Sequence, residues 1–176
     1  MNRKTRLRRV ALLCVHFTRN LAFYRAISDL LSGQKEGDFW ITMQGNCVDT
    51  AVLEWCKLFG ERSGKHSWQK IADDPDTFRS QLLSELQINN RKWEDCWSKL
   101  RSYRNAFVAH LDSDETMHIL NMSLPYSMVE FYYSFVTTSR EEFDRSGLPS
   151  DLSIYYGESY AVAESQIKHL QSPHEE

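Results

Sequence analysis

The chain has 176 residues, of which 41% are hydrophobic and 12% aromatic, and this is the size and composition of one domain with a packed core. Collagen-like, disordered and disulfide-dense classes are therefore excluded. The 21 Lys and Arg residues stand against 24 Asp and Glu residues, so a formal charge of −3 excludes a polycation drawn as a whole to nucleic acid. The charge is uneven, however, because residues 1–28 sum to +7 and the rest of the chain sums to −10.

The longest apolar run, Val10–Val15, is far shorter than the roughly 20 residues that cross a bilayer. His16 and Arg19 interrupt this run too early for a secretory signal. The Arg-rich N-terminus is similar in composition to a transit peptide, but it continues into a core-like helix. We therefore expect a cytoplasmic protein without a membrane partner. The cysteines match no zinc spacing and are expected to be buried thiols: Cys14, Cys47, Cys56 and Cys96.

The first third of the chain has the apolar spacing of long helices. Apolar residues at steps of three and four predict a helix over 10–31, stopped by Gly33. A second run predicts a helix over 40–58, with Asp38 as its N-cap and Gly60 as its stop.

The middle of the chain continues this pattern after a polar interruption. Residues 61–76 predict a loop that contains a short helix around Trp68, and 77–87 predict a short helix. The strongest helical periodicity extends over 93–110.

The last third begins with a break in the period. Residues 111–124 predict a loop, with a short extended piece over 117–122. Pro125 stands where a helix tolerates proline best and predicts a helix to Gly147. A final helix is expected over 156–170, and with few glycines and prolines elsewhere the fold class is all-α.

The end of the predicted 93–110 helix gathers groups that handle phosphate. Arg104 offers a planar guanidinium with five donors, Asn105 an amide that orients a substrate, and His110 a base near neutral pH. A base that takes the proton of a 2′-hydroxyl and a cation that stabilises the attacked phosphate suffice to cleave RNA without metal. On an ideal helix Arg104 and His110 lie about 120° apart. They meet only if the arginine curls over, the helix end distorts, or a second subunit completes the pocket.

A structural interpretation of these residues stays open. A histidine that ends an apolar stripe is often a core or helix-end residue, and its imidazolium suits a helix C-terminus. Arg101 and Arg104 are equally typical of a solvated helix face.

The string RNAFVAHLD resembles the signature of the HEPN superfamily, which is an Arg, four to six residues and a His, with a polar residue directly after the Arg. The surrounding blocks resemble, in order, the U-type abortive-infection branch of that superfamily. These blocks, within residues 50–135, are AVLEWCKLFG, His66, Trp68, the Phe78–Leu86 helix and LPYSMVEFYY.

The resemblance implies an up-and-down helical bundle of HEPN type with additional helices, over residues 1–171, followed by a flexible tail over 172–176. It implies a homodimer in which the motif helices face each other across a cleft. It further implies a metal-independent endoribonuclease, used as a toxin or a phage-defence effector, that leaves a 2′,3′-cyclic phosphate on RNA and needs no cofactor.

Carried over to this sequence, the resemblance makes Arg104 the phosphate-binding cation, Asn105 the positioning residue and His110 the acid/base group. The substrate-binding candidates around them are Arg101, Tyr103 and Asp112. Leu111 and Asp112 replace the His-x-Tyr ending of toxins whose tyrosine is modified by a nucleotidyltransferase antitoxin, which puts that form of control in doubt. An antitoxin or a defence-operon partner stays open.

Two other functions remain in view. The first is a non-catalytic HEPN-like module that binds a nucleotide or a protein partner. The second is a structural helical subunit, in which Arg104 and His110 would be buried and paired within the monomer.

Three weaker patterns accompany the motif. The acidic loop after the motif offers metal-binding atoms without a recognised spacing: His110, Asp112, Asp114, Glu115 and His118. Five tryptophans have the chemistry to stack bases, but most fall on helical stripes and are more typical of core. The basic N-terminus, with Arg6, Arg8 and Arg9, has three interpretations: contact with RNA, contact with an acidic partner subunit, or solvated helix surface.

Overall fold

The computed structural model describes residues 2–31, 37–108, 121–138 and 143–171. The described chain is helical and contains no strand, which confirms the all-α expectation. Its α-helices are α1 (Arg3–Leu31), α2 (Asp38–Trp55), α3 (Trp68–Ile71), α4 (Pro75–Glu85), α5 (Asn90–Tyr103), α6 (Ser123–Thr138) and α7 (Leu152–Gln171). Two π-helical segments continue α2 and α5: η1 (Cys56–Gly60) and η2 (Arg104–Val108).

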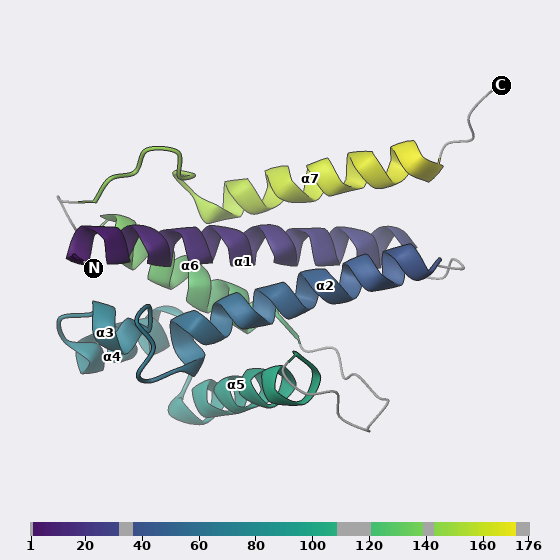
Figure 1. Ribbon diagram of the computed structural model, residues 1–176. Helices are drawn as coiled ribbons and strands as arrows, with labels where there is room; N and C mark the ends of the chain where they lie inside the picture. The colour runs from purple at the N-terminus through teal and green to yellow at the C-terminus, as the bar shows by residue number, and fades with distance from the viewer. Residues whose placement is uncertain (1, 32–36, 109–120, 139–142, 172–176) are drawn as a thin grey trace.

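Helix α1 is the centre of the bundle. It packs along α2 and α7 and also contacts α6, while α5 lies on the far side of α2 (Figure 1). Asn2 caps α1, because its side-chain oxygen accepts a hydrogen bond from the backbone N–H of Thr5 at 2.8 Å. This cap explains why α1 begins seven residues before the predicted start at residue 10. None of the described helices is long and apolar enough for a bilayer.

An aromatic cluster joins the short helices to the long ones. Trp55 of α2 stacks on Phe59 of η1 with ring centroids 5.3 Å apart. Phe78 of α4 stacks on Trp68 of α3, also at 5.3 Å, and meets the ring of Tyr132 on α6 edge-on at 5.4 Å. Each such pair contributes about 0.5–1.5 kcal/mol beyond the apolar area it buries. Trp55, Trp68 and Trp93 are all buried, as core tryptophans should be.

The four cysteines are free and buried, as the sequence predicts. Burial raises the pKa of the Cys56 thiol to about 11 and that of Cys96 to about 12. Burial also raises the pKa of Cys14 and Cys47. The thiols therefore behave as small apolar side chains within the core.

The predicted starts of two helices need correction. The N-cap of α2 is Gly37, and Asp38 is already the first helical residue, where its negative charge favours the helix dipole. Helix α4 begins at Pro75 instead of residue 77, because Asp74 caps it. The Asp74 carboxylate accepts hydrogen bonds from the backbone N–H groups of Asp76 and Thr77 at 3.1 and 3.2 Å.

The expected helix over 125–147 is wrong at its C-terminal end. Helix α6 ends at Thr138, and residues 143–147 are not helical, with Gly147 in a turn at φ +71°. The helix also begins earlier, at Ser123, because Asn121 accepts a hydrogen bond from the Ser123 N–H at 2.9 Å.

Other expectations reach beyond the described chain. Asn121 and Met122 are not in a strand, and the remainder of the extended piece expected over 117–122 lies outside the described residues. So do the expected tail over 172–176 and the acidic loop after the motif.

Candidate functional site

The motif segment begins where α5 changes from α-helix to π-helix. In η2 the hydrogen bonds run from residue i to i+5, so each turn holds more residues than an α-helical turn. The 120° separation expected between Arg104 and His110 assumes an ideal α-helix, and the described start of this segment departs from that geometry. π-helical turns occur often at functional sites. His110 and Asp112 lie outside the described residues.

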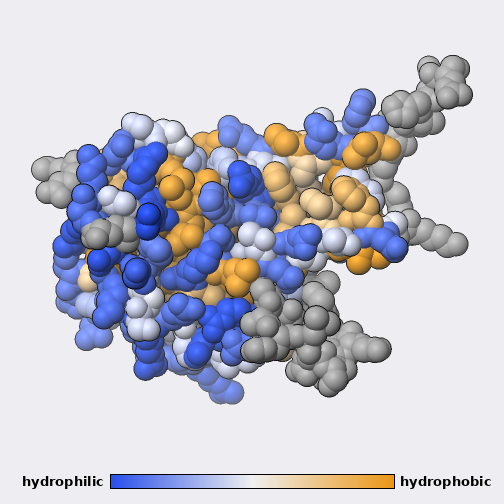
Figure 2. Space-filling view, in the orientation of Figure 1, coloured by the Kyte–Doolittle hydropathy of each residue, from blue (hydrophilic) through white to orange (hydrophobic). Residues whose placement is uncertain are grey.

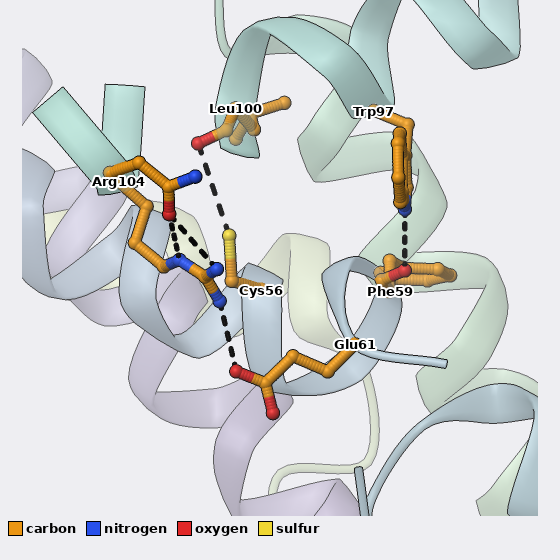
Figure 3. Close-up of polar contacts among 7 residues, drawn as sticks. Cys56, Phe59, Glu61, Trp97, Leu100 and Arg104 are labelled. Atoms are coloured by element: carbon orange, nitrogen blue, oxygen red, sulfur yellow. Dashed lines mark hydrogen bonds and ion pairs between the residues drawn. The ribbon is translucent and has the colours of Figure 1, made fainter. Parts of the chain in front are cut away.

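Arg104 and Asn105 form one hydrogen-bonded pair. The Asn105 side-chain oxygen accepts hydrogen bonds from Nε and Nη2 of Arg104 at 3.1 and 3.0 Å. Nη1 of Arg104 donates to Oε1 of Glu61 at 2.9 Å (Figure 3). Three of the five guanidinium N–H groups are thereby used, and the geometry of the guanidinium plane is set by its own neighbour in sequence. The Arg104 side chain is 17% exposed and Glu61 is 50% exposed.

Glu61 is a site residue that the sequence did not indicate. It follows η1 directly, 43 residues before Arg104, and no local spacing relates the two. Gly60 brings this end of η1 close to α5. A Cβ at position 60 would lie 3.2 Å from Sγ of Cys56 and 3.5 Å from Cγ of Arg101.

Arg101 lies one turn before Arg104 and stacks on an aromatic ring. Its guanidinium carbon is 4.3 Å from the ring centroid of Trp97, the distance of a cation–π contact. The Trp97 ring is held in turn, because its Nε1 donates to the carbonyl oxygen of Phe59 at 3.0 Å (Figure 3). Nε of Arg101 is buried and has no hydrogen-bond partner among the described residues. Arg101 is therefore a second oriented cation on the same helix as Arg104.

Tyr103 has a different environment from the one expected of a substrate-binding residue. Its side chain is buried, and its hydroxyl donates to Oδ1 of Asp49 on α2 at 2.8 Å. Burial, followed by the bond to Asp49, raises the pKa of this phenol above its usual range. Tyr103 therefore joins α5 to α2, and we remove it from the candidates for direct contact with substrate.

The basic N-terminal residues divide into two groups. Arg3 forms an ion pair with Asp73, and Arg8 donates to the carbonyl oxygens of Asp144 and Ser146 at 3.0 and 2.8 Å. These arginines hold other parts of the same chain, a contact that none of the three interpretations included. Arg6 and Arg9 have no such partner within the described chain.

The described residues contain no group of three or more His, Cys, Asp or Glu side chains arranged to hold a metal ion. The chain matches no protein-family model, no curated protein and no solved structure. Its likeness to HEPN proteins therefore rests on the motif and on the order of the sequence blocks around it.

Proposed function

We propose that the chain is a metal-independent, HEPN-type endoribonuclease that acts on RNA in the cytoplasm as a homodimer. The observation that supports this best is the Arg104–Asn105 pair, in which the amide orients the guanidinium at the end of α5. Two guanidinium N–H groups remain for a phosphate, and the stacked Arg101 supplies a second cation one turn away.

The chemistry assigned to the motif is an internal transesterification. His110 takes the proton of a ribose 2′-hydroxyl, and the 2′-oxygen attacks the adjacent phosphorus. The P–O5′ bond breaks, and a protonated group returns a proton to the 5′-oxygen, so the products are a 2′,3′-cyclic phosphate and a 5′-hydroxyl. Arg104 stabilises the charge that develops on the phosphoryl oxygens.

The ion pair with Glu61 is compatible with this role. Pairs of this exposure contribute about 0–1 kcal/mol, so a phosphate is able to displace the carboxylate at small cost.

The test measures cleavage of a mixed RNA pool by the purified protein in EDTA. We expect His110→Ala and Arg104→Ala each to lower the rate by about 10²-fold or more, the size of losing one proton-transfer or charge-stabilising group. The melting temperature should change little. His169→Ala, an exposed histidine in the last turn of α7, is the matched control and should cleave like the wild type. Equal activity in His110→Ala contradicts the proposal, and cleavage that requires a divalent metal contradicts its metal independence.

The homodimer is tested separately by light scattering during gel filtration. A twofold mass that persists in His110→Ala supports a dimer in which the motif is part of the cleft but not of the contact.

A toxin or phage-defence role predicts that overproduction of the wild type stops growth and that His110→Ala does not. Co-expression of neighbouring genes would then reveal an antitoxin or a defence-operon partner.

A non-catalytic nucleotide-binding or protein-binding module is the second candidate. It is favoured by one observation, which is that Arg104 is already paired within the chain by Glu61 and Asn105. If overproduction is harmless and RNA stays intact, while a nucleotide or a protein partner raises the melting temperature, this candidate replaces the ribonuclease.

A further inference from the structure

A second cationic region lies at the end of the bundle where α1 begins. The charges of Arg6 and Arg9 of α1, of Lys57 of η1 and of Lys65 in the following loop all act on His66, and we call these five residues the His66 cluster. Hydrophilic side chains gather over this end of the molecule (Figure 2). Within the part of the chain that the structure describes, the charges that act on His66 are all cationic.

Among the described residues, most of the cluster's cations have no counter-ion. Lys57 pairs with Glu54 at 2.9 Å. For Arg6, Arg9 and Lys65, the described parts of the chain provide no carboxylate at ion-pair distance.

This arrangement is unfavourable for the isolated chain. The first turn of α1 contains no acid, although the N-terminal end of a helix dipole favours negative charge by about 0.3–1 kcal/mol. Arg6 and Arg9 are three residues apart on one helix, a spacing at which like charges repel by about 0.2–0.5 kcal/mol. A bound anion would remove both penalties.

Within the described chain, three buried polar atoms in and beside the cluster are also without the hydrogen-bond partner that a bound ligand would provide. Nε of Arg6, Nε2 of His66 and Oγ of Ser67 are buried and have no hydrogen-bond partner among the described residues. Ser67 is fully buried. A buried polar group left unpaired costs about 1–3 kcal/mol.

The loop that presents Lys65 and His66 is already fixed in place. The Gly64 N–H donates to the carbonyl of Glu61, and the Ser67 N–H donates to the carbonyl of Gly64, both at 3.1 Å. The Tyr132 hydroxyl of α6 donates to the carbonyl of His66, also at 3.1 Å. A ligand therefore meets an ordered loop and loses little binding energy to ordering it.

A hollow adjoins the cluster. It has a volume of about 250 Å³ and is lined by residues of α1 and of α3 with its C-terminal flank, among them Arg3, Arg6, Lys70 and Asp73. Arg6 belongs to both features, so an anion on the cluster has space beside it for the rest of a larger molecule.

We propose that the His66 cluster binds the phosphate groups of a nucleotide ligand, at a site separate from the Arg104–Asn105 pair. The phosphates come either from an RNA strand or from a free mononucleotide. One loop connects the two sites, because Glu61 at its start contacts Arg104 and Lys65 and His66 at its end belong to the cluster. Only the RNA source rests on the proposed ribonuclease function.

The first experiment follows the His66 imidazole by NMR across a pH titration, and His66→Gln identifies its resonance. Burial, and then the charges of Arg9, Lys57, Arg6 and Lys65, hold the pKa of His66 below its usual value. Inorganic phosphate that binds the cluster offsets these charges and should raise that pKa by about one unit relative to chloride at equal ionic strength.

Arg9→Gln/Lys65→Gln tests whether this response belongs to the cluster. The pKa of His66 should start higher in this double variant, because two cations are gone, and phosphate should no longer change it. A wild-type pKa that is the same in phosphate and in chloride overturns the proposal.

The second experiment separates the two sources of phosphate. A single-stranded 2′-O-methyl oligonucleotide binds without offering the 2′-hydroxyl needed for cleavage, and fluorescence anisotropy measures its affinity over a range of salt. If RNA is the ligand, the double variant should lower the slope of log K against log salt by about 1.4, since each lost phosphate contact on a single strand contributes about 0.7. If a mononucleotide is the ligand, adenosine monophosphate raises the pKa of His66 and the oligonucleotide slope does not change.

The matched control is Arg19→Gln/Lys92→Gln, which removes the same charge from exposed positions on α1 and α5 outside the cluster. It should behave as the wild type in both experiments. Arg104→Ala keeps the response of His66 to phosphate whether or not it abolishes cleavage, so failure of the ribonuclease proposal and failure of the phosphate site give different results. An equal loss of oligonucleotide affinity in both double variants contradicts a specific site.

Discussion

At the scale of single residues, the contact between Arg104 and Glu61 places an intrachain carboxylate where the proposed phosphate binds. Asn105 orients the guanidinium from the adjacent position in the chain, whereas Glu61 would compete with the proposed phosphate for it. The two neighbours of Arg104 therefore have opposite effects on the proposed reaction.

We expect Glu61→Gln to strengthen substrate binding. Because a partly exposed pair of this kind is worth about 0–1 kcal/mol, the KM for RNA should fall by up to about fivefold. Steady-state cleavage in EDTA measures this change, and the melting temperature should fall by a few degrees at most. Glu94→Gln, which removes the carboxylate paired with Arg79 at 2.8 Å, is the control and should leave the KM unchanged. A lower rate in Glu61→Gln would show that Glu61 positions Arg104.

The sequence predicts the site only where its residues are close in the chain. Arg104 and Asn105 are adjacent and the motif names both, but it assigns Asn105 to the substrate and not to the Arg104 guanidinium that it contacts. Glu61 and Arg104 meet through the packing of η1 on α5, and no short pattern contains that contact. Tyr103 lies on the apolar stripe that predicts the helix, and this position was the better indicator of its burial.

At the scale of helices, caps decide where the elements start. Asn89 caps α5, because its side-chain oxygen accepts a hydrogen bond from the Lys92 N–H at 2.9 Å. Asn89→Ala should lower the free energy of unfolding by about 1 kcal/mol, the usual effect of losing such a cap, and urea unfolding would measure it. Asn90→Ala, at the first helical position, is the control, and there alanine's higher helix propensity should preserve or increase stability. Equal effects would show that the cap contributes nothing.

Apolar periodicity predicts the helices but not the two π-helical segments. In η1 and η2 each turn takes in an additional residue, while the apolar residues around them keep steps of three and four. No proline marks either segment, and only Gly60 ends one. The two segments lie where α2 and η1 pack on α5 and η2, a long-range contact that no local spacing contains. The prediction of a helix reaching Gly147 was wrong for a different reason. The apolar residue Phe143 fits the helical spacing, but residues 143–147 are not helical.

At the scale of the whole molecule, Phe78 of α4 joins the aromatic side chains of two other helices, α3 and α6. Its ring contacts those of Trp68, Phe131, Tyr132 and Phe135 at centroid distances of 4.8–5.4 Å, and it is 1% exposed. Phe78→Ala should therefore lower the free energy of unfolding by about 3–5 kcal/mol. Urea unfolding followed by tryptophan fluorescence measures this. Phe39→Ala, at a site 62% exposed, should change it by less than about 0.5 kcal/mol.

The uneven charge seen in the sequence has a structural counterpart. Arg3 and Arg8, at the basic end of α1, bind Asp73 and the segment at Asp144 and Ser146, while Arg6 and Arg9 have no carboxylate at ion-pair distance within the described residues. The distribution of charge along the sequence predicts a basic N-terminus. It does not distinguish the arginines that bind other parts of the chain from those that do not, because this depends on which loops fold against each arginine.

The rate at which the buried thiols are alkylated would measure how often the helix bundle opens. Alkylating reagents attack the thiolate, and the raised pKa of each cysteine keeps it protonated and shielded while the helices stay packed. Modification of Cys14, at the centre of α1, would then record how often that helix separates from its neighbours. A cysteine introduced by Lys65→Cys would be the one readily labelled position, so a dye placed beside His66 would need no change to the native cysteines.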